Sequence, residues 1–298
     1  MIDIFHTWVD KIKANDAHQV SELYHQDGIL LGTFSNIERV GRSLIFDYFE
    51  DLLKSPIDVQ IISEKAFIAK SAFRLFYANS IGDDILLYAD TDKNTPLGTL
   101  HTLRQQKKKI GAPVYYALSD FVAPQECERL DGCGAFICTI QKVDQYAKAF
   151  EEQNDDYNAI LTKALGDRLA EALTEYTHEQ VRKHHWAYQS NESLSKSELI
   201  KEAYQGIRPA AGYPACPDHS QLEAVWDLLN GKAQTGAILT ENHAIYPAST
   251  VSGFYFSHKH AKYFSVGPIA KDQMSEYAQK QSLSLSDCET LLASNKGY

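Results

Sequence analysis

The sequence has no long apolar run, no basic start and no excess of positive charge, and each absence excludes a class of protein. Its 298 residues include no stretch of apolar side chains near membrane-spanning length. The start, Met1-Ile2-Asp3-Ile4, lacks the basic segment of a secretory signal. A formal net charge of −10 argues against nucleic acid as a general partner. We therefore expect a cytoplasmic protein that binds neither nucleic acid nor a membrane.

Cysteine is scarce and irregularly spaced. The five cysteines are Cys127, Cys133, Cys138, Cys216 and Cys288, and no two of them form a Cys-x-x-Cys pair. An odd number in a chain without an export signal predicts reduced thiols rather than a disulfide framework. The spacing fits no common zinc site, so we expect no metal centre.

Other chemical motifs are incomplete. Gly132-Cys133-Gly134 lacks the third glycine of a dinucleotide loop, and Asp16-Ala17-His18 lacks the glycine of a cobalamin-ligand loop. Cys216-Pro217-Asp218-His219 contains metal-ligand types, but its spacing matches no common site, and the two imidazoles of His258-Lys259-His260 lack a third ligand. These motifs alone assign no chemistry.

The composition, 44% apolar and 23% charged, is typical of a soluble globular protein. The sequence contains both helical and strand-like patterns of apolar residues. Helical spacing predicts helices over about 4–12, 17–24, 44–53, 103–109, 155–186, 196–204, 219–230 and near the C-terminus. Strand-like runs are 29–33, 59–62, 72–77, 85–88, 114–122, 134–143, 248–257 and 263–266. The absence of a regular βαβ alternation predicts an α+β fold with antiparallel pairing.

Four residues are the predicted helix N-caps: Ser43, Ser195, Asp218 and Ser286. The longest helix has a predicted buried stripe, made of Tyr157, Leu161, Leu165, Leu169, Leu173 and Tyr176. Its neighbouring face carries Glu171, Glu175 and His178. Two carboxylates and an imidazole on one face suit acid–base or ligand chemistry, and a solvated helix face is the alternative interpretation.

The segment from Gly206 to His219 has three prolines and two glycines in fourteen residues. Proline fixes φ and glycine permits positive φ, so the loop is predicted to hold one irregular shape. Arg208 lies at its head and Tyr213 at its centre. A rigid loop that presents backbone polar groups, a guanidinium and a phenol is typical of a binding site for a small polar ligand. The alternative interpretation is an ordinary rigid connection between two secondary-structure elements.

Nine segments form a pattern wider than any of these motifs. They are residues 76–85, 101–106, 119–124, 134–136, 155–158, 165–172, 204–209, 212–217 and 251–258, and they include Gly206-Ile207-Arg208-Pro209 and Gly212-Tyr213-Pro214. Together they closely resemble the activation domain of cobalamin-dependent methionine synthase, over about residues 70–298. The resemblance implies a curved α+β domain on a twisted antiparallel sheet with flanking helices.

The resemblance also implies an activity. The family's domain binds S-adenosylmethionine and supports reductive methylation of cob(II)alamin, with an electron from flavodoxin or a flavoprotein reductase. By resemblance, S-adenosylmethionine is the cofactor of this chain, and cobalamin reaches it only through a partner, a cobalamin-binding methyltransferase. The chain would serve methionine biosynthesis as part of a methyltransferase activity, with no catalytic residue of its own.

A ligand site carries over by motif. It comprises Arg208, Pro209, Ala210, Gly212, Tyr213, Tyr263, Phe264 and Glu171. The Arg208 loop would hold the methionine end of the ligand, since arginine suits a carboxylate through charge-assisted bonds. The aromatic pair and the helix carboxylate would lie beside the ligand, where they suit a sulfonium and an ammonium.

The residues before Ala72 depart from the family pattern. The family's Asp-Trp-x-Pro-Phe-Phe motif, whose aspartate contacts the ligand, has no counterpart, because the chain has no Asp-Trp pair. Losing one such charged contact typically weakens binding by about 1.5–3 kcal/mol. Residues 1–64 instead resemble half of a SnoaL-like or nuclear transport factor 2-like (cystatin-like) cone fold, through Trp8 and residues 15–17, 23–24, 27–33 and 48–49. We therefore expect two domains, 1–64 and 65–298.

Two functions from different classes stay open. One is an S-adenosylmethionine-binding activation module that acts in trans on a separate cobalamin methyltransferase. The other is a non-catalytic binding or scaffold protein with a decayed S-adenosylmethionine site. The sequence shows neither the catalytic barrels nor the cobalamin-binding domain of methionine synthase, so we expect no complete enzyme here. A small hydrophobic ligand in the cone-like half is a third, weaker alternative.

Overall fold

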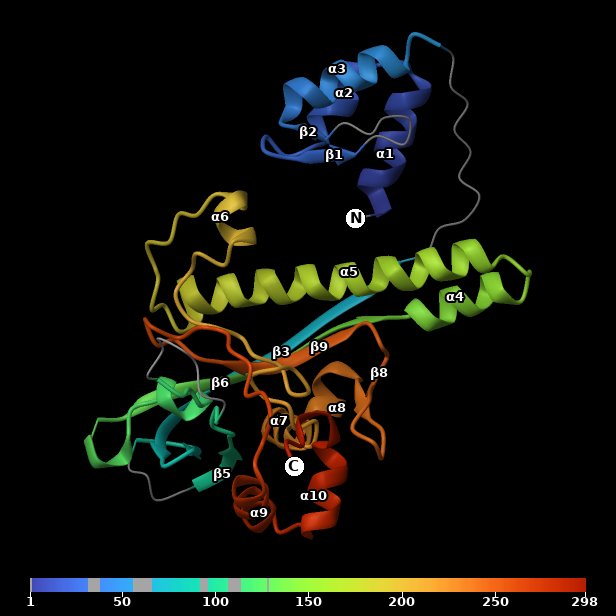
Figure 1. Cartoon of the computed structure of the whole chain (residues 1–298). Helices are drawn as coiled ribbons and strands as arrows, with labels where there is room; N and C mark the ends of the chain where they lie inside the picture. The colour runs from blue at the N-terminus through green and yellow to red at the C-terminus, as the bar shows by residue number, and fades with distance from the viewer. Residues whose placement is uncertain (1, 32–37, 56–65, 92–95, 107–113, 128) are drawn as a thin grey trace. The chain divides into compact units, whose positions relative to one another are not determined.

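The computed structural model describes residues 2–31, 38–55, 66–91, 96–106, 114–127 and 129–298 (Figure 1). The chain divides into two compact units, Met1–Ala66 and Phe67–Tyr298. The predicted strand at 59–62 and residues 107–109 of the predicted helix lie outside the described residues. None of the described helices combines the length and the apolar character needed to cross a bilayer.

The first unit contains three helices and a two-stranded sheet among its described residues. The helices are α1 (Ile2–Lys13), α2 (Ala17–Glu22) and α3 (Arg42–Leu52), and β1 (Ile29–Leu31) pairs antiparallel with β2 (Glu38–Val40). Ile12, Val20, Ile45, Tyr48, Phe49 and Leu53 form its small core. The predicted N-cap Ser43 is wrong, since the N-cap of α3 is Gly41, two residues earlier, and Ser43 lies in the first turn. The cone-like resemblance of residues 1–64 stays a prediction.

The second unit is built on one antiparallel sheet. Its strands are β3 (Ile68–Ile81), β4 (Asp84–Tyr88), β5 (Pro96–His101), β6 (Asp131–Gln141) and β9 (Thr250–Tyr255). They lie in the order β5-β4-β3-β6-β9, and every neighbouring pair is antiparallel. Gly82 has a φ of +56°, which suits the tight turn that joins β3 to β4. The prediction of an α+β fold with an antiparallel sheet and flanking helices is confirmed.

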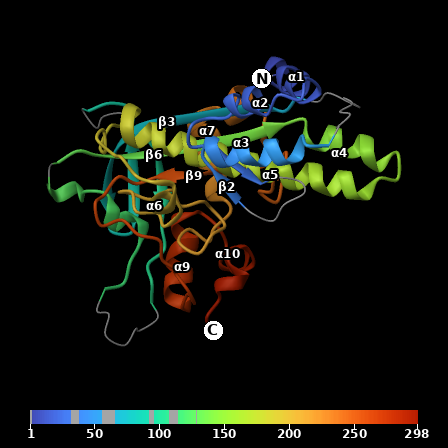
Figure 2. The ribbon, with the colours of Figure 1, turned by 90° about the horizontal axis from the view of Figure 1, so that it is seen from above.

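Helices cover both faces of this sheet (Figures 1 and 2). The long helix α5 (Asp156–Gln180) and its antiparallel neighbour α4 (Val143–Glu151) lie on one face. The other face packs against α7 (Gln221–Leu229) and α8 (Gly231–Thr235). Beyond them, α9 (Lys271–Lys280) and α10 (Leu285–Leu291) form a separate small core around Met274 and Cys288.

The remaining elements are short. They are η1 (Leu118–Phe121), η2 (Gln125–Cys127), a π-helical turn η3 (Val181–His185), α6 (Lys196–Ile200), β7 (Ile238–Leu239), β8 (Ile245–Tyr246) and η4 (Ala293–Asn295). Three predictions are therefore wrong: residues 114–122 form no strand, residues 103–106 form no helix, and residues 263–266 form no strand. In η1 the carboxylate of Asp120 accepts from Ala117 N at 2.9 Å, which favours a helical turn over an extended strand.

The predicted buried stripe of α5 is also wrong. Five of its six members are exposed, namely Tyr157, Leu161, Leu165, Leu169 and Tyr176, and only Leu173 packs against the sheet side. The buried side chains are small: Ala159, Gly166, Ala170, Thr174 and Thr177, together with His178. A Cβ on Gly166 would lie 2.6 Å from Val143 Cγ2. Close packing of α5 therefore selects small residues and leaves the large apolar ones outside.

The predicted N-caps have mixed outcomes. Ser195 caps α6 with Glu198 in a capping box, as predicted. Asp218 is not the cap of α7, because Ser220 precedes that helix and Asp218 is buried against Tyr277, whose hydroxyl donates to it at 2.6 Å. Helix α10 begins after Ser284, whose hydroxyl accepts from Asp287 N, so Ser286 lies inside the first turn.

Candidate functional site

The loop that follows α6 runs beside the end of β9. Ile207 and Phe256 exchange two backbone hydrogen bonds of 2.9 and 3.0 Å, and Phe254 N donates to Pro209 O at 2.9 Å. This pairing needs a glycine on β9, because a Cβ on Gly253 would lie 2.4 Å from Pro209 O. The edge strand of the sheet thus fixes the backbone on both sides of Arg208.

The second half of the loop is a compact turn. Gly212 N donates to Cys216 O at 2.7 Å, and Cys216 N donates to Tyr213 O at 2.9 Å. Gly212 has a φ of +86°, and a Cβ there would lie 2.2 Å from the His219 ring. The neighbouring Ala211 and Ala215 are buried, whereas Tyr213 is 65% exposed. The loop has the irregular shape that its prolines and glycines predict, and it presents Tyr213 to solvent.

The guanidinium of Arg208 lies against three side chains. Nη1 lies 3.1 Å from His178 Nδ1 and donates to Tyr204 Oη at 2.7 Å. Nη2 donates to Glu175 Oε1. The arginine side chain is 13% exposed and the Glu175 side chain 51%. Arg208 is therefore held from beneath by buried groups, and Glu175 contacts it from the solvent side.

Tyr263 joins this site and Phe264 turns away from it. Tyr263 Oη accepts from Arg208 N at 3.0 Å. Phe264 packs instead into an aromatic cluster, with ring centroids 6.0 Å from Tyr116 and 6.2 Å from Phe121. Of the predicted aromatic pair, Tyr263 is the one that is hydrogen-bonded to Arg208.

The electrostatics of the site follow from burial and from the cations within it. Burial raises the pKa of Tyr204 to about 12 and also raises the pKa of Tyr263. Burial opposes the charge on Arg208, but Tyr204, Tyr263 and Glu175 outweigh it, so the pKa of Arg208 is raised. Burial, together with Arg182 and Arg208, holds the pKa of His178 well below its ordinary value. Arg208 is thus a fixed cation beside a neutral imidazole.

The predicted helix carboxylate Glu171 does not touch Arg208 in this structure. It is exposed and pairs with Arg168, three residues earlier, at 2.7 Å. Glu175, one turn further along α5, is the carboxylate that contacts Arg208. The place of Glu171 in a ligand site stays a prediction, as do the ligand contacts of Pro209, Ala210, Gly212, Tyr213, Tyr263 and Phe264.

Sequence reasoning missed a buried layer under Arg208. Arg182 donates to Glu192 through Nε at 2.7 Å and Nη2 at 2.6 Å, and both side chains are almost fully buried. The Arg182 guanidinium lies 4.1 Å from the centre of the Tyr204 ring. The only sequence signal was the position of Tyr204, four residues before Arg208, in a segment that resembles the family.

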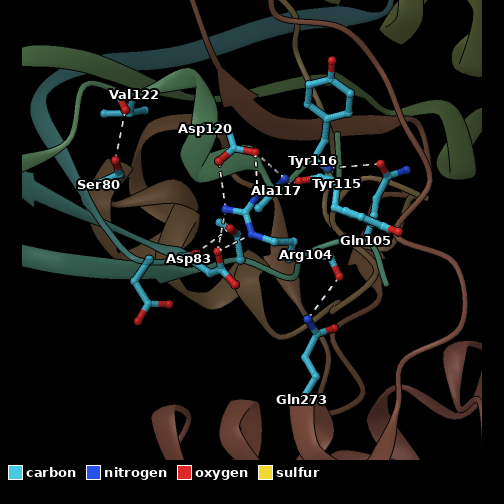
Figure 3. Close-up of polar contacts among 12 residues, drawn as sticks. Ser80, Asp83, Arg104, Gln105, Tyr115, Tyr116, Ala117, Asp120, Val122 and Gln273 are labelled. Atoms are coloured by element: carbon cyan, nitrogen blue, oxygen red, sulfur yellow. Dashed lines mark hydrogen bonds and ion pairs between the residues drawn. The ribbon is translucent and has the colours of Figure 1, made fainter. Parts of the chain in front are cut away.

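A second arginine organises the segment that carries the aromatic cluster (Figure 3). Arg104 makes two hydrogen bonds to Asp120, at 2.7 and 2.8 Å, and its Nε donates to Asp83 at 2.8 Å. The adjacent Gln105 donates to Ser265 O at 2.7 Å and accepts from Tyr116 N at 3.1 Å. This network ties residues 114–121 to the chain beside Phe264.

Two other classes of site find no support in the part of the chain that the structure describes. No three His, Cys, Asp or Glu side chains come together there as metal ligands. All five cysteines are free thiols, and burial raises the pKa of Cys216 to about 12. A groove between β3 and α7 is lined by Arg74 and Asp227 among others, and it includes none of the predicted site residues.

Comparisons with known proteins agree with this fold. The family of vitamin B12-dependent methionine synthase activation domains matches residues 44–282. A crystal structure of the MetH reactivation domain bound to AdoHcy is 46% identical in sequence, with a TM-score of 0.77, and the match covers 85% of this chain and 76% of that chain.

A calcium/calmodulin-dependent protein kinase II association domain from Xanthomonas campestris also matches, with 18% identity over 46% of this chain and 69% of that chain. Its TM-score of 0.17 carries no argument about the fold. The first match and the family match together cover most of the second unit, with its sheet and the Arg208 loop. The chain therefore belongs to the family of vitamin B12-dependent methionine synthase activation domains.

Proposed function

We propose that the second unit binds S-adenosylmethionine at the Arg208 loop, and that the chain thereby acts in trans in the reductive methylation of cob(II)alamin on a separate methyltransferase. The observation that carries the proposal is the hydrogen bonding of Arg208. Both protons of Nη1 are used by His178 and Tyr204, and one proton of Nη2 is used by Glu175. Among the described residues, Nε has no acceptor, so part of the guanidinium remains available to a carboxylate.

The residues around Arg208 fit the charges of S-adenosylmethionine. Its carboxylate suits the guanidinium, since charge-assisted bonds to arginine are the strong ones. Its sulfonium and ammonium suit the exposed carboxylates of α5, Glu175 and Glu171, and the exposed rings of Tyr213 and Tyr263. A crystal structure in the same family holds AdoHcy, which has the same amino-acid and adenosine groups without the methyl group.

S-adenosylmethionine supplies an electrophilic methyl group when it is bound. The chain's own part is to hold the amino-acid end of that ligand on a rigid loop backed by β9. In this proposal a partner protein carries cobalamin, and a flavodoxin-like donor supplies the electron. The family's place in a vitamin B12-dependent enzyme supports the cobalamin-carrying partner, and the electron donor is part of the proposal.

A reactivation assay tests this function. A cobalamin-dependent methionine synthase whose own activation domain has been removed is allowed to oxidise, then incubated with the full chain, S-adenosylmethionine and reduced flavodoxin. The proposal predicts that methyl transfer to homocysteine returns only when all three are present. Arg208→Ala should abolish the recovery, while Arg74→Ala, at an exposed arginine of β3 outside the site, should leave it intact.

If the wild-type chain binds S-adenosylmethionine but restores no activity, the in-trans role is wrong. If it does not bind at all, the scaffold alternative is favoured.

A further inference from the structure

His178 is a fully buried imidazole directly beneath Arg208. Its ring stacks on Tyr255 with centroids 5.1 Å apart and an angle of 9° between the planes. It also meets the ring of Tyr204 edge to face, at 5.1 Å and 84°. Two aromatic contacts at right angles to each other fix the plane of the imidazole, and with it the directions of both nitrogens.

The partners of the two nitrogens define one tautomer. Nδ1 lies 3.1 Å from Arg208 Nη1, and Nε2 lies 3.4 Å from Tyr188 Oη. A guanidinium has only donors, so Nδ1 must be unprotonated to accept from it. In the neutral ring the proton is then on Nε2, from which it is donated to Tyr188. The lowered pKa of His178, which comes from burial and from Arg182 and Arg208, agrees with a neutral ring.

This tautomer has a consequence for Arg208. Nη1 donates one proton to His178 Nδ1 and the other to Tyr204 Oη at 2.7 Å. A ligand carboxylate can therefore reach only the edge formed by Nε and Nη2. Arg182 provides an example in the same protein of a carboxylate bound at this edge of a guanidinium. Its Nε and Nη2 donate to the two carboxylate oxygens of Glu192 at 2.7 and 2.6 Å.

We propose that His178 is a positioning residue, which accepts a hydrogen bond from Arg208 Nη1 and so presents the Nε and Nη2 edge of the guanidinium to the carboxylate of an amino-acid ligand. This inference rests on the proposed function, in which that ligand is S-adenosylmethionine. Glu175 contacts Nη2 on the same edge, so a ligand carboxylate must share that group with it or displace it.

Two substitutions separate the acceptor from the ring. His178→Phe keeps an aromatic ring against Tyr255 and Tyr204 but removes the acceptor. His178→Asn removes the ring but places an amide oxygen near the position of Nδ1. We expect calorimetric affinity for S-adenosylmethionine to fall about tenfold or more in the Phe variant and to stay within about threefold of wild type in the Asn variant. Near-UV circular dichroism of each variant checks that it is folded.

A spectroscopic measurement tests the hydrogen bond without any ligand. Nitrogen NMR of the full chain labelled in histidine should show His178, assigned as the signal missing from both variants, as a neutral ring protonated at Nε2. A proton on Nδ1, or a folded Phe variant with wild-type affinity, overturns the proposal. If the wild-type chain does not bind S-adenosylmethionine, the proposed function fails, while the NMR result still decides whether His178 accepts from Arg208.

Discussion

The backbone N–H of Arg208 donates a 3.0 Å hydrogen bond to the phenol oxygen of Tyr263, which lies 55 residues later in the chain. The bond joins the rigid loop to the segment that follows β9. Both residues were predicted site residues, and they meet through backbone and side chain rather than through two side chains. Tyr263, 41% exposed, therefore has one end in the loop and an open ring surface toward solvent.

Gly253→Ala should disturb the site through the backbone. The new Cβ would lie 2.4 Å from Pro209 O, so the Arg208 loop must move away from β9. Overpacking of this kind typically costs about 1–3 kcal/mol of stability. We expect a lower midpoint in urea unfolding and weaker S-adenosylmethionine binding. Gly98→Ala is the control, because a Cβ there meets nothing within 4 Å. Equal stability and affinity in the two variants would show that the close approach is unimportant.

Glu192→Gln should destabilise the second unit strongly. It removes one charge of a pair whose side chains are 1% and 5% exposed, and Arg182 then remains as an uncompensated buried cation. Removing one partner of a buried pair typically costs about 3–5 kcal/mol. The control is Lys163→Ala, which breaks the exposed pair with Glu151 and should leave the unfolding midpoint unchanged. A Glu192→Gln variant as stable as the control would contradict the assigned role of the pair.

Stability should depend on pH through His178. Its pKa in the folded chain is held well below the ordinary value of 6.5, by burial and by Arg182 and Arg208. Below pH 6.5 the unfolded chain binds a proton that the folded chain does not, so stability falls as the pH falls. The slope approaches about 1.4 kcal/mol per pH unit, and the effect vanishes above the unfolded pKa.

Urea unfolding between pH 5 and 7.5 measures this effect as the difference between wild type and His178→Phe. Other titrating groups affect both proteins and cancel in the difference. The stability of the wild type relative to the Phe variant should decrease toward pH 5. A difference that does not change with pH would mean that His178 is protonated equally easily in the folded and unfolded chains.

The outer face of α5 should tolerate polar substitution. Leu161 and Leu165 are 52% and 48% exposed, so changing either to Gln should alter stability by no more than about 0.5 kcal/mol. Ala170 is 1% exposed, and Ala170→Leu should cost about 1–3 kcal/mol by overpacking. Thermal melts of the three variants check this. A large loss from Leu161→Gln would show that this face is covered in solution.

Most strands of the sheet were predictable from the sequence, because the local pattern of residues determines where they form. The strands β3, β4, β6 and β9 were predicted from their strand-like runs. The buried face of α5 was not, because helical periodicity identifies a stripe of large apolar residues and not the side that packs. There the contact with Val143 and the sheet requires small residues, which only the tertiary structure shows.

The part of the candidate site that was predictable from the sequence is the loop around Arg208, where the residue types restrict the backbone. The prolines and glycines around Arg208 fix the loop, and the likeness to a known family pointed to Tyr263. The helix face with Glu175 and His178 was singled out as a possible ligand face, but the burial of His178, Arg182 and Glu192 was not predictable, because charged and titratable types usually lie at the surface. Only the packing of α5 and η3 against Tyr204 and Tyr255 explains their burial.

The most direct test of the central claim is a calorimetric titration of the full chain with S-adenosylmethionine, beside Arg208→Ala and Arg74→Ala. We predict saturable binding to wild type and to Arg74→Ala, and binding about ten- to 150-fold weaker to Arg208→Ala, as expected for a lost charge-assisted contact of about 1.5–3 kcal/mol. No binding to wild type at millimolar ligand, or equal affinity in all three proteins, would contradict the account.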